Sequence, residues 1–565
     1  MYEMPTRSTS YLNPVTILLS IICYISTLGF ATPKNEFTTF EKTKMNDKKN
    51  LGQYFTPEDM AAFMLDLSRC PTTDRVLEPS SGEGVFLDLL EQRNFRNVVA
   101  YEIDEVLAKK RSNVICESFV SADIDNGFGL VIGNPPYIRW KNLSNDLKKE
   151  LEVNPLWTRY FNALCDYSYI FMLKRVELLK EGGELIFICP EYWMNTTHSQ
   201  TLRNYFLEHG YFTDFYIFNE APIFKDATVS TVVFRFVKSK ATTKPKMRIA
   251  KFTTKIAITK DILERLKERK PIKDVEYLEI PQFSIGERWA FIEHTEKEQL
   301  TRLMEKCRRN NDSLLFGQII TIGDICDIGN GMVSGLDKAF QLSDNLNLSQ
   351  QEIDASLMVC KAKNLTQYYA FKPTRYINIP DTVVSEEDFQ CSYPLFYEQM
   401  SPYKQKLNER YQYGKGLLPY WQWSFKRNEK LFTQDTARIF VPCKERISSK
   451  HFVRFALIPP KHYPTQDVTA LFKKNNVLES LEYIVAYLNH PLVFKWIKNY
   501  GIVKGNIVEF SEKPLATIPF RSINWNSDDE RKLHDEITLL VKELLQTHNA
   551  ELVQKINQRL DELLK

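Results

Sequence analysis

The chain has 565 residues, of which 43% are hydrophobic, 26% charged and 13% aromatic, with a formal net charge of +3. These values are typical of a globular protein and exclude a disordered, collagen-like or multi-span membrane chain, and the length favours two or three domains. The ten cysteines stand singly, without a CxxC pair or a Cys/His cluster. We therefore expect no metal site and no disulfide framework, which favours a reducing cytoplasm.

Residues 1–44 form an extension with an uncharged apolar stretch, Val15–Ala31. Its length suits a signal-peptide core or a marginal membrane anchor. Glu3, however, offsets Arg7 and weakens the cationic start of a secretory signal. We expect this extension to lie outside the working domains of a cytoplasmic protein, with a membrane tether or signal peptide as the less favoured interpretation.

Between residues 45 and 240, short apolar runs alternate with segments of helical periodicity. The predicted strands are Arg75–Leu77, Val98–Tyr101, Leu130–Ile132, Glu184–Ile188, Phe215–Ile217 and Thr231–Phe236. The predicted helices are Pro57–Leu67, Gly84–Leu90, Glu105–Arg111 and Tyr167–Leu179. This alternation indicates an α/β fold with a doubly wound, mostly parallel sheet.

The polar stretch Ser239–Lys246 predicts a linker to a second domain of mixed α+β type, residues 247–525. Charged helices are expected near Asp261–Lys270 and Glu296–Asn310. At the C-terminus, residues 527–565, a capping-box pattern precedes leucine and isoleucine residues at helical spacing. These are Ser527, Glu530, Leu533, Ile537, Leu540, Leu544, Leu552, Ile556, Leu560 and Leu563. A helical hairpin that packs on its own chain is the simplest interpretation, and docking of a partner helix is the alternative.

The charge is divided unevenly between the two halves of the chain. Residues 46–239 hold 21 basic and 27 acidic side chains, whereas residues 240–565 hold 49 basic and 41 acidic ones. The net charges are therefore −6 and +8, so the second half carries the basic excess that a nucleic-acid partner favours.

The strongest motif is Asn134-Pro135-Pro136-Tyr137, directly after the apolar run that ends at Gly133. A strand end in an open α/β sheet is where ligands bind. An amide oxygen and a proline-restricted carbonyl are two fixed acceptors for a planar NH2 group, and Tyr137 offers a flat face for a base. A turn that merely ends the strand is the simpler interpretation, which the asparagine and aromatic flanks disfavour.

Acidic and small residues follow the other predicted strands. Glu78-Pro79-Ser80-Ser81-Gly82-Glu83-Gly84 is a turn into a helix start, where a ligand can approach the backbone. Glu102 ends the next strand and suits ribose hydroxyls, and Asp123 ends a later segment and can accept from an amino group. One acid for each strand–helix turn predicts a nucleoside site, although each acid alone is more often a solvated loop residue.

In this order, with the run Leu51–Pro57, these motifs resemble the γ-class, TaqI-like N6-adenine DNA methyltransferases. The resemblance implies a Rossmann-like catalytic domain that uses S-adenosyl-L-methionine, followed by a target recognition domain that binds double-stranded DNA. It leaves open a separate cognate restriction endonuclease as part of a restriction–modification system. We expect a monomer.

The resemblance also implies roles for single residues. Thr56 would hold the methionine end of the cofactor, with Glu78, Pro79, Ser80, Ser81, Gly82 and Gly84 lining that pocket. Glu102 would bind the ribose, Asp123 the adenine amino group of the cofactor, and Asn134 and Pro135 the target amine. Tyr137 would stack on the flipped base, with Phe224 as the second stacking ring unless Phe224 is a core residue.

The resemblance continues diffusely into the second half, at Gly323–Phe340, Trp421–Phe425, Ile439–Pro442 and Tyr487–Pro491. Basic and aromatic residues interleave over Lys404–Lys430, which suits phosphate contacts and base readout, unless the aromatics are core.

Three alternatives remain from the residues. The same motif serves methyltransferases that act on an RNA base, cytosine N4 or a protein glutamine, because it requires only a planar amine. A bifunctional restriction enzyme is disfavoured because we find no convincing nuclease motif. A non-catalytic DNA-binding subunit is disfavoured by the intact motif and nucleoside site.

Overall fold

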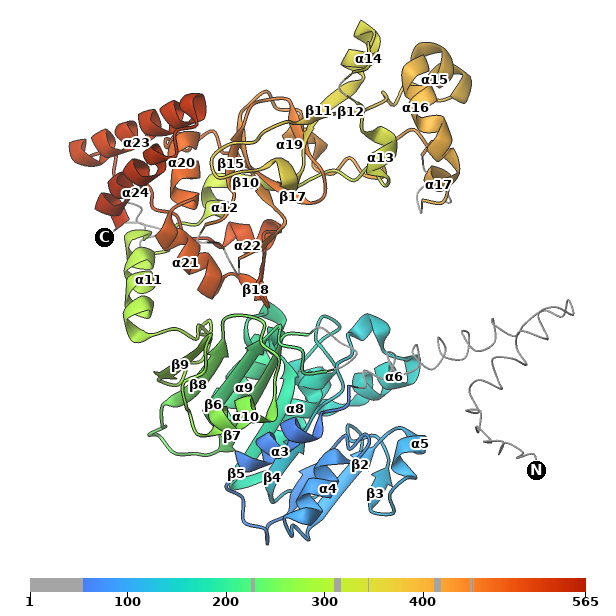
Figure 1. Ribbon diagram of the computed structural model, residues 1–565, viewed down its shortest axis with the longest axis vertical. Coiled ribbons are helices and arrows are strands. Elements are labelled where there is room, and N and C mark those ends of the chain that lie inside the picture. The colour runs from blue at the N-terminus through green and yellow to red at the C-terminus, as the bar shows by residue number, and fades with distance from the viewer. Residues whose placement is uncertain are drawn as a thin grey trace, which may run out of the picture.

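The computed structural model describes residues 54–224, 229–308, 317–343, 345–410, 418–447, 450 and 452–564. Figure 1 shows an N-terminal body, residues 54–292, below a C-terminal body, residues 293–564, with α11 (His294–Lys306) beside the junction. The predicted apolar stretch Val15–Ala31 lies outside the described residues. Within the described ranges, none of the helices is long and apolar enough to cross a membrane.

One large sheet organises the N-terminal body. In the described residues its nine strands run in the order β3-β2-β1-β4-β5-β7-β6-β8-β9. Their bounds are β1 Val76–Glu78, β2 Val98–Glu102, β3 Val114–Cys116, β4 Phe128–Gly133, β5 Leu179–Pro190, β6 Gly210–Asn219, β7 Thr231–Lys238, β8 Met247–Phe252 and β9 Val275–Ile280. The strands from β3 to β5 are parallel, which confirms the predicted doubly wound, Rossmann-like fold.

Helices cover both faces of this sheet. They are α3 Glu58–Asp66, α4 Val85–Gln92, α5 Glu105–Ala108, α6 Asn145–Val153, α7 Pro155–Tyr160, α8 Ser168–Leu178, α9 Gln200–His209 and α10 Lys260–Lys267. In β4, Leu130 and Ile132 pack with α3, α4 and α10, whereas Val131 packs with α7, α8 and α9. This alternation is the two-residue period of a strand buried on both faces.

The predicted linker Ser239–Lys246 is a connection inside the sheet. After it, β8 pairs in parallel with β6 over residues Arg248–Lys251, and β9 pairs antiparallel with β8. Most of residues 239–246 are exposed, which explains the polar composition without a domain boundary. The sheet therefore continues 40 residues beyond the predicted catalytic boundary at residue 240, to Ile280.

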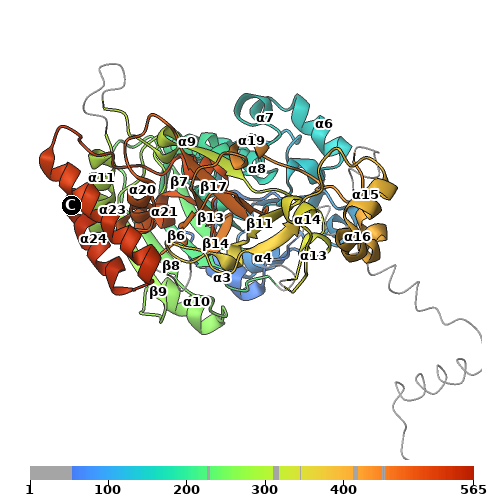
Figure 2. The ribbon, with the colours of Figure 1, turned by 90° about the horizontal axis from the view of Figure 1, so that it is seen from above.

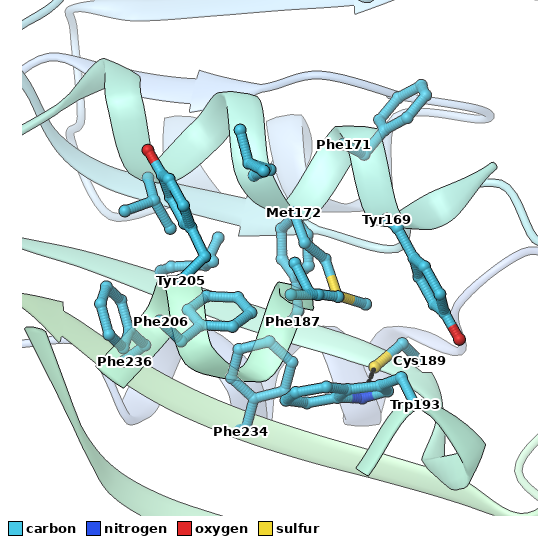
Figure 3. Close-up of a cluster of buried hydrophobic side chains, with 14 of the residues drawn as sticks. Tyr169, Phe171, Met172, Phe187, Cys189, Trp193, Tyr205, Phe206, Phe234 and Phe236 are labelled. Atoms are coloured by element: carbon cyan, nitrogen blue, oxygen red, sulfur yellow. Dashed lines mark hydrogen bonds between the residues drawn. The ribbon is translucent and has the colours of Figure 1, made fainter. Parts of the chain in front are cut away.

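An aromatic core lies between α8, α9 and the strands β5 and β7. Figure 3 shows Phe187 and Cys189 of β5 among side chains of these elements, with Trp193 just beyond β5. The indole nitrogen of Trp193 donates to Cys189 Sγ at 3.2 Å. Because each buried aromatic removes about 150–250 Å² of surface from water, this core fixes the end of β5 beside the end of β4.

In the described part of the C-terminal body there are three smaller sheets, ordered β10-β17-β13-β15, β12-β11-β16 and β14-β19-β18. The strands are β10 Cys326–Asn330, β11 Ser356–Cys360, β12 Thr374–Ile377, β13 Arg438–Pro442, β14 Lys444–Arg446, β15 Ala456–Ile458, β16 His462–Pro464, β17 Val468–Lys473, β18 Ile502–Lys504 and β19 Ile507–Glu509. Its other helices are α12 Ile322–Ile325, α13 Asp337–Phe340, α14 Gln350–Asp354, α15 Glu386–Ser392, α16 Pro394–Met400, α17 Lys404–Asn408, α19 Glu429–Phe432, α20 Leu481–Leu488, α21 Pro491–Tyr500, α22 Glu512–Ala516, α23 Asp528–Thr547 and α24 Glu551–Leu564.

The predicted C-terminal hairpin is present as α23 and α24. Its apolar residues, including Ile537 and Ile556, join the core around α20, so the hairpin packs on its own chain. Ser527 Oγ accepts from the backbone N–H of Glu530, but the Glu530 carboxylate accepts from Asn524 and Arg521. The hairpin and α15–α16 occupy opposite ends of the C-terminal body (Figure 2).

Candidate functional site

A cavity opens at the carboxyl ends of β1 to β4. Its volume is about 930 Å³, including the space at its open mouth. Eight of the predicted cofactor residues line it: Thr56, Glu78, Pro79, Ser80, Ser81, Gly82, Glu102 and Asn134. They gather because parallel strands end at one edge of the sheet, and each of these residues ends or follows a strand, except Thr56, which precedes α3.

Glu102 ties two turns of the cavity together. One carboxylate oxygen accepts from the backbone N–H of Gly82 at 2.7 Å, and the other from that of Asp104 at 2.9 Å. Burial raises the pKa of Glu102, and these backbone bonds oppose the rise. Gly82 has φ +54° and approaches the Phe55 ring, so a side chain there would be both strained and crowded. Gly84, at φ +86°, is the residue from which α4 begins.

Glu78 is fully buried at the end of β1, and its Oε2 has no hydrogen-bond partner among the described residues. Burial raises its pKa well above the ordinary value, whereas the nearby guanidinium of Arg175 lowers it. Arg175 is itself fully buried, with its Cζ 3.9 Å from the centre of the Phe187 ring. A buried acceptor without a partner costs free energy, so the cavity offers an oxygen that a donor on a ligand can satisfy.

The Asn134 side chain is held at the cavity edge by two acceptors. Its Nδ2 donates to the carbonyl of Tyr54 at 2.6 Å and to Thr56 Oγ1 at 3.2 Å. The backbone carbonyl of Asn134 accepts from Ser80 Oγ at 3.1 Å. These bonds orient the amide, so its Oδ1 is left as the acceptor. Pro135 is buried directly behind it.

Three aromatic rings gather next to Asn134. The ring centre of Tyr54 is 6.0 Å from that of Tyr137 and 6.0 Å from that of Phe224. The Tyr137 hydroxyl lies against both Asn134 Oδ1 and the carbonyl of Ile188, the latter at 2.6 Å. Burial raises the pKa of Tyr137 well above its ordinary value, so the hydroxyl keeps its proton. Phe224 is buried, as the core interpretation expects, yet it contacts this cluster.

Asp123 does not join the site. It is exposed and lies outside the cavity lining, so the predicted contact with the cofactor's adenine has no support in this geometry. Glu117, Ser118 and Phe119 line that part of the cavity instead, because β3 ends at Cys116 and the turn follows directly. A three-residue strand gives too short a pattern to be recognised, although its position between two predicted elements was the available signal.

Lys174 stabilises the turn that follows β3. Lys174 Nζ of α8 donates to the carbonyls of Phe119 and Val120, at 2.8 and 3.1 Å, and to that of Ala122 at 2.5 Å. Burial lowers the pKa of Lys174 to about 8. Phe171 of α8 packs on Phe119 with ring centres 5.2 Å apart, and both rings line the cavity.

Similarity to known proteins agrees with this site. The chain is 44% identical over 524 residues, 91% of this chain and 98% of the relative, to type II methyltransferase M.HindII of Haemophilus influenzae. It is 42% identical over 520 residues, with the same coverage of each chain, to M.HincII of Haemophilus influenzae. Residues 81–224 match the Eco57I restriction-modification methylase family. The chain belongs to the type II DNA methyltransferases of restriction–modification systems.

The fold also matches a much larger enzyme. The structure of the type IIL restriction-modification enzyme MmeI in complex with DNA covers 98% of this chain and 75% of its own, with a TM-score of 0.56 and 12% identity. At that identity the match establishes the arrangement of the two bodies and nothing finer. This methyltransferase thus pairs a Rossmann-like body with a C-terminal body of smaller sheets.

The aromatic residues of the C-terminal body are mostly structural. Tyr420, Trp421 and Trp423 are buried in one core with α15 and α16, as the core interpretation expects. Lys426 pairs with Asp381 at 2.8 Å, and Lys404 pairs with Glu386 at 2.7 Å. In the same range Phe425 is exposed, and Tyr411 and Tyr413 lie outside the described residues.

Proposed function

We propose that this methyltransferase takes the methyl group of S-adenosyl-L-methionine and places it on N6 of an adenine flipped out of double-stranded DNA. The observation that supports this most directly is the orientation of Asn134. Its amide nitrogen donates to Tyr54 and Thr56, so its oxygen, which the Tyr137 hydroxyl contacts, is the acceptor that this side chain brings to the lining of a nucleoside-sized cavity.

The cavity fits the cofactor on its own chemistry. The Glu78 oxygen without a described partner, in a fully buried carboxyl group, suits the amino group of a methionine moiety. Glu102 stands at the end of β2, where an acid accepts from ribose hydroxyls. The rings of Phe119 and Phe171 supply a flat, apolar wall for an adenine. When bound, the cofactor supplies an electrophilic methyl group on a sulfonium, so the chain needs neither a nucleophile of its own nor a metal.

The chain's contribution is alignment of the target amine. Asn134 Oδ1 and the Pro135 carbonyl accept the two N6 hydrogens, which draws the nitrogen lone pair out of conjugation with the ring. Asn134 Oδ1 is free for this when the Tyr137 hydroxyl donates to the Ile188 carbonyl instead. This change of acceptor requires only rotation of the Tyr137 hydroxyl, so the ring stays in place for stacking.

The target base must leave the duplex to reach this site. Unstacking costs a few kcal/mol, and stacking on aromatic rings returns roughly 1–3 kcal/mol per base. Tyr137 and Phe224 are the rings that we assign to this role, since both contact Tyr54 beside Asn134. The C-terminal body would hold the duplex and select the sequence. Residues 240–292, the last part of the N-terminal body, carry 13 basic and 7 acidic side chains, so they hold most of the basic excess and would add phosphate contacts.

Two measurements test the proposal. Equilibrium dialysis with labelled S-adenosyl-L-methionine should show binding that Glu102→Ala weakens at least tenfold. Methylation-sensitive sequencing of DNA from cells that express the chain should show N6-methyladenine at one sequence, and an Asn134→Ala strain should show none. N4-methylcytosine at that sequence, or methylation of RNA alone, would overturn the assignment.

A further inference from the structure

A β-hairpin of the C-terminal body reaches into the N-terminal body. Its strands are β18 and β19, and its tip is Gly505-Asn506. Figure 1 shows β18 at the junction of the two bodies, directly above the large sheet. The tip meets the sheet where β5 and β6 end and β7 begins.

Hydrogen bonds fix the hairpin to this edge. The backbone N–H of Gly505 donates to Glu191 Oε1 at 3.0 Å, and Asn195 Nδ2 donates to the carbonyl of Val503 at 2.6 Å. Glu191 and Asn195 belong to the turn that follows β5. This part of the junction therefore ties the hairpin to the strand that neighbours the Asn134 loop.

Further contacts reach the connection between β6 and β7. Asn219 Nδ2 donates to Asn506 Oδ1 at 3.2 Å, and Arg446 of the adjacent strand β14 forms an ion pair with Glu220 at 2.9 Å. Asn219 ends β6 in a left-handed conformation with φ +53°, and it is buried. The last residue of β6 and the residue after it are thus held by contacts with the C-terminal body.

The tip is too closely packed for a side chain. Gly505 has φ +60°, and a Cβ atom there would lie 2.6 Å from Ser230 Oγ and 3.0 Å from Glu220 Cγ. Ser230 immediately precedes β7, and its carbonyl accepts from the backbone N–H of Glu191 at 2.9 Å. One glycine therefore contacts both ends of the β6–β7 connection.

That connection carries Phe224, to which we assign a base-stacking role. We propose that the β18–β19 hairpin positions the residues that directly follow β6, so that Asn506 and Gly505 set the place of Phe224 in the base pocket. The inference rests on the proposed function of Phe224. It assigns positioning residues to the body that holds DNA, and so links duplex binding with capture of the flipped base.

The test uses the full chain and two duplexes. The cognate adenine duplex gives kcat, and a matching duplex whose target adenine, once mapped, is replaced by 2-aminopurine reports unstacking, because this base fluoresces when it is unstacked. Gly505→Ala and Asn506→Ala should reduce the fluorescence gain and kcat about tenfold, with the Kd for the cofactor unchanged. Gly286→Ala is the matched control, because Gly286 has φ +79° but nothing within 4 Å of its Cβ position. It reproduces the backbone strain without the contact.

The outcomes separate the two proposals. If Phe224→Ala leaves the fluorescence gain and kcat intact, the stacking role is wrong. If Phe224→Ala abolishes the gain while Gly505→Ala and Asn506→Ala behave like Gly286→Ala, the hairpin inference is wrong and the stacking role stands. If Gly505→Ala and Gly286→Ala lose the fluorescence gain and kcat equally, backbone strain rather than the contact with Ser230 is responsible. Asn506→Ala then tests the hairpin inference, which a tenfold loss supports and wild-type behaviour refutes.

Discussion

Asn134→Ala removes two functions that the structure separates. The side chain donates to the Tyr54 carbonyl and Thr56 Oγ1, which stabilises the fold, and it presents Oδ1, which would accept from the target amine. Each lost hydrogen bond costs about 1 kcal/mol net, so the free energy of unfolding should fall by about 2 kcal/mol. Loss of a polar contact to the reacting group costs about 3–4 kcal/mol, or roughly 10²–10³ in kcat.

The assay is methyl transfer from labelled cofactor to cognate duplex, at saturating cofactor, alongside thermal unfolding. Thr56→Val is the matched control, because it deletes one of the same bonds and keeps the Asn134 oxygen. We expect Thr56→Val to lose only a few-fold in kcat. If folded Asn134→Ala retains kcat within tenfold of wild type, or if Thr56→Val loses as much activity, the acceptor role is refuted.

Three other outcomes are expected. Tyr137→Phe should keep kcat within a few-fold, since the ring remains, whereas Tyr137→Ala should reduce it at least tenfold in the same assay. Lys174→Met should weaken cofactor binding about tenfold by dialysis, because it frees three carbonyls of the turn at Phe119–Ala122. Burial raises the pKa of Glu191 from 4.5 to about 7. The charge of Glu220 adds to this rise, whereas the Gly505 N–H and the charge of Lys251 oppose it. The folded chain then holds that proton more tightly than the unfolded chain, so stability should fall by up to roughly 3 kcal/mol as pH rises through 4.5 to 7. Glu191→Gln should flatten that part of the pH profile in denaturant titrations, and an unchanged slope would contradict the assignment.

The residues at strand ends were predictable because strand position and chemistry are both local in sequence. Glu78, Glu102 and Asn134 each end or follow a buried apolar run, and parallel pairing brings such positions together. Their order along the chain was therefore enough to predict one site. Tyr54 is harder to predict from the strand pattern, because it precedes a helix and contributes its backbone carbonyl and its ring to the site.

The structure differs from the expectation where local pattern and tertiary contact disagree. Ser239–Lys246 has the composition of a linker, yet pairing of β6 with β8 continues the sheet past it. Asp123 has the right chemistry, but the turn after the short strand β3 places Glu117 and Ser118 at the cavity. Strand pairing decides both cases, across 34 residues between β6 and β8 and across 14 residues between β2 and β3. The composition of neither segment contains that information.

Arg175 shows most clearly what a local sequence pattern fails to predict. In sequence, Lys174-Arg175 in a helix is typical of a solvated face, yet the structure buries the guanidinium completely against Phe187 and Phe171. Its three nitrogens have no hydrogen-bond partner among the described residues, and burial lowers its pKa well below the ordinary value. A buried cation is tolerated only near a compensating charge. The carboxyl group of Glu78, in the cavity lining, supplies an opposite charge that raises the pKa of Arg175. Each group opposes the pKa shift that burial imposes on the other, so a residue outside the cavity lining acts on the carboxyl group that we assign to the cofactor.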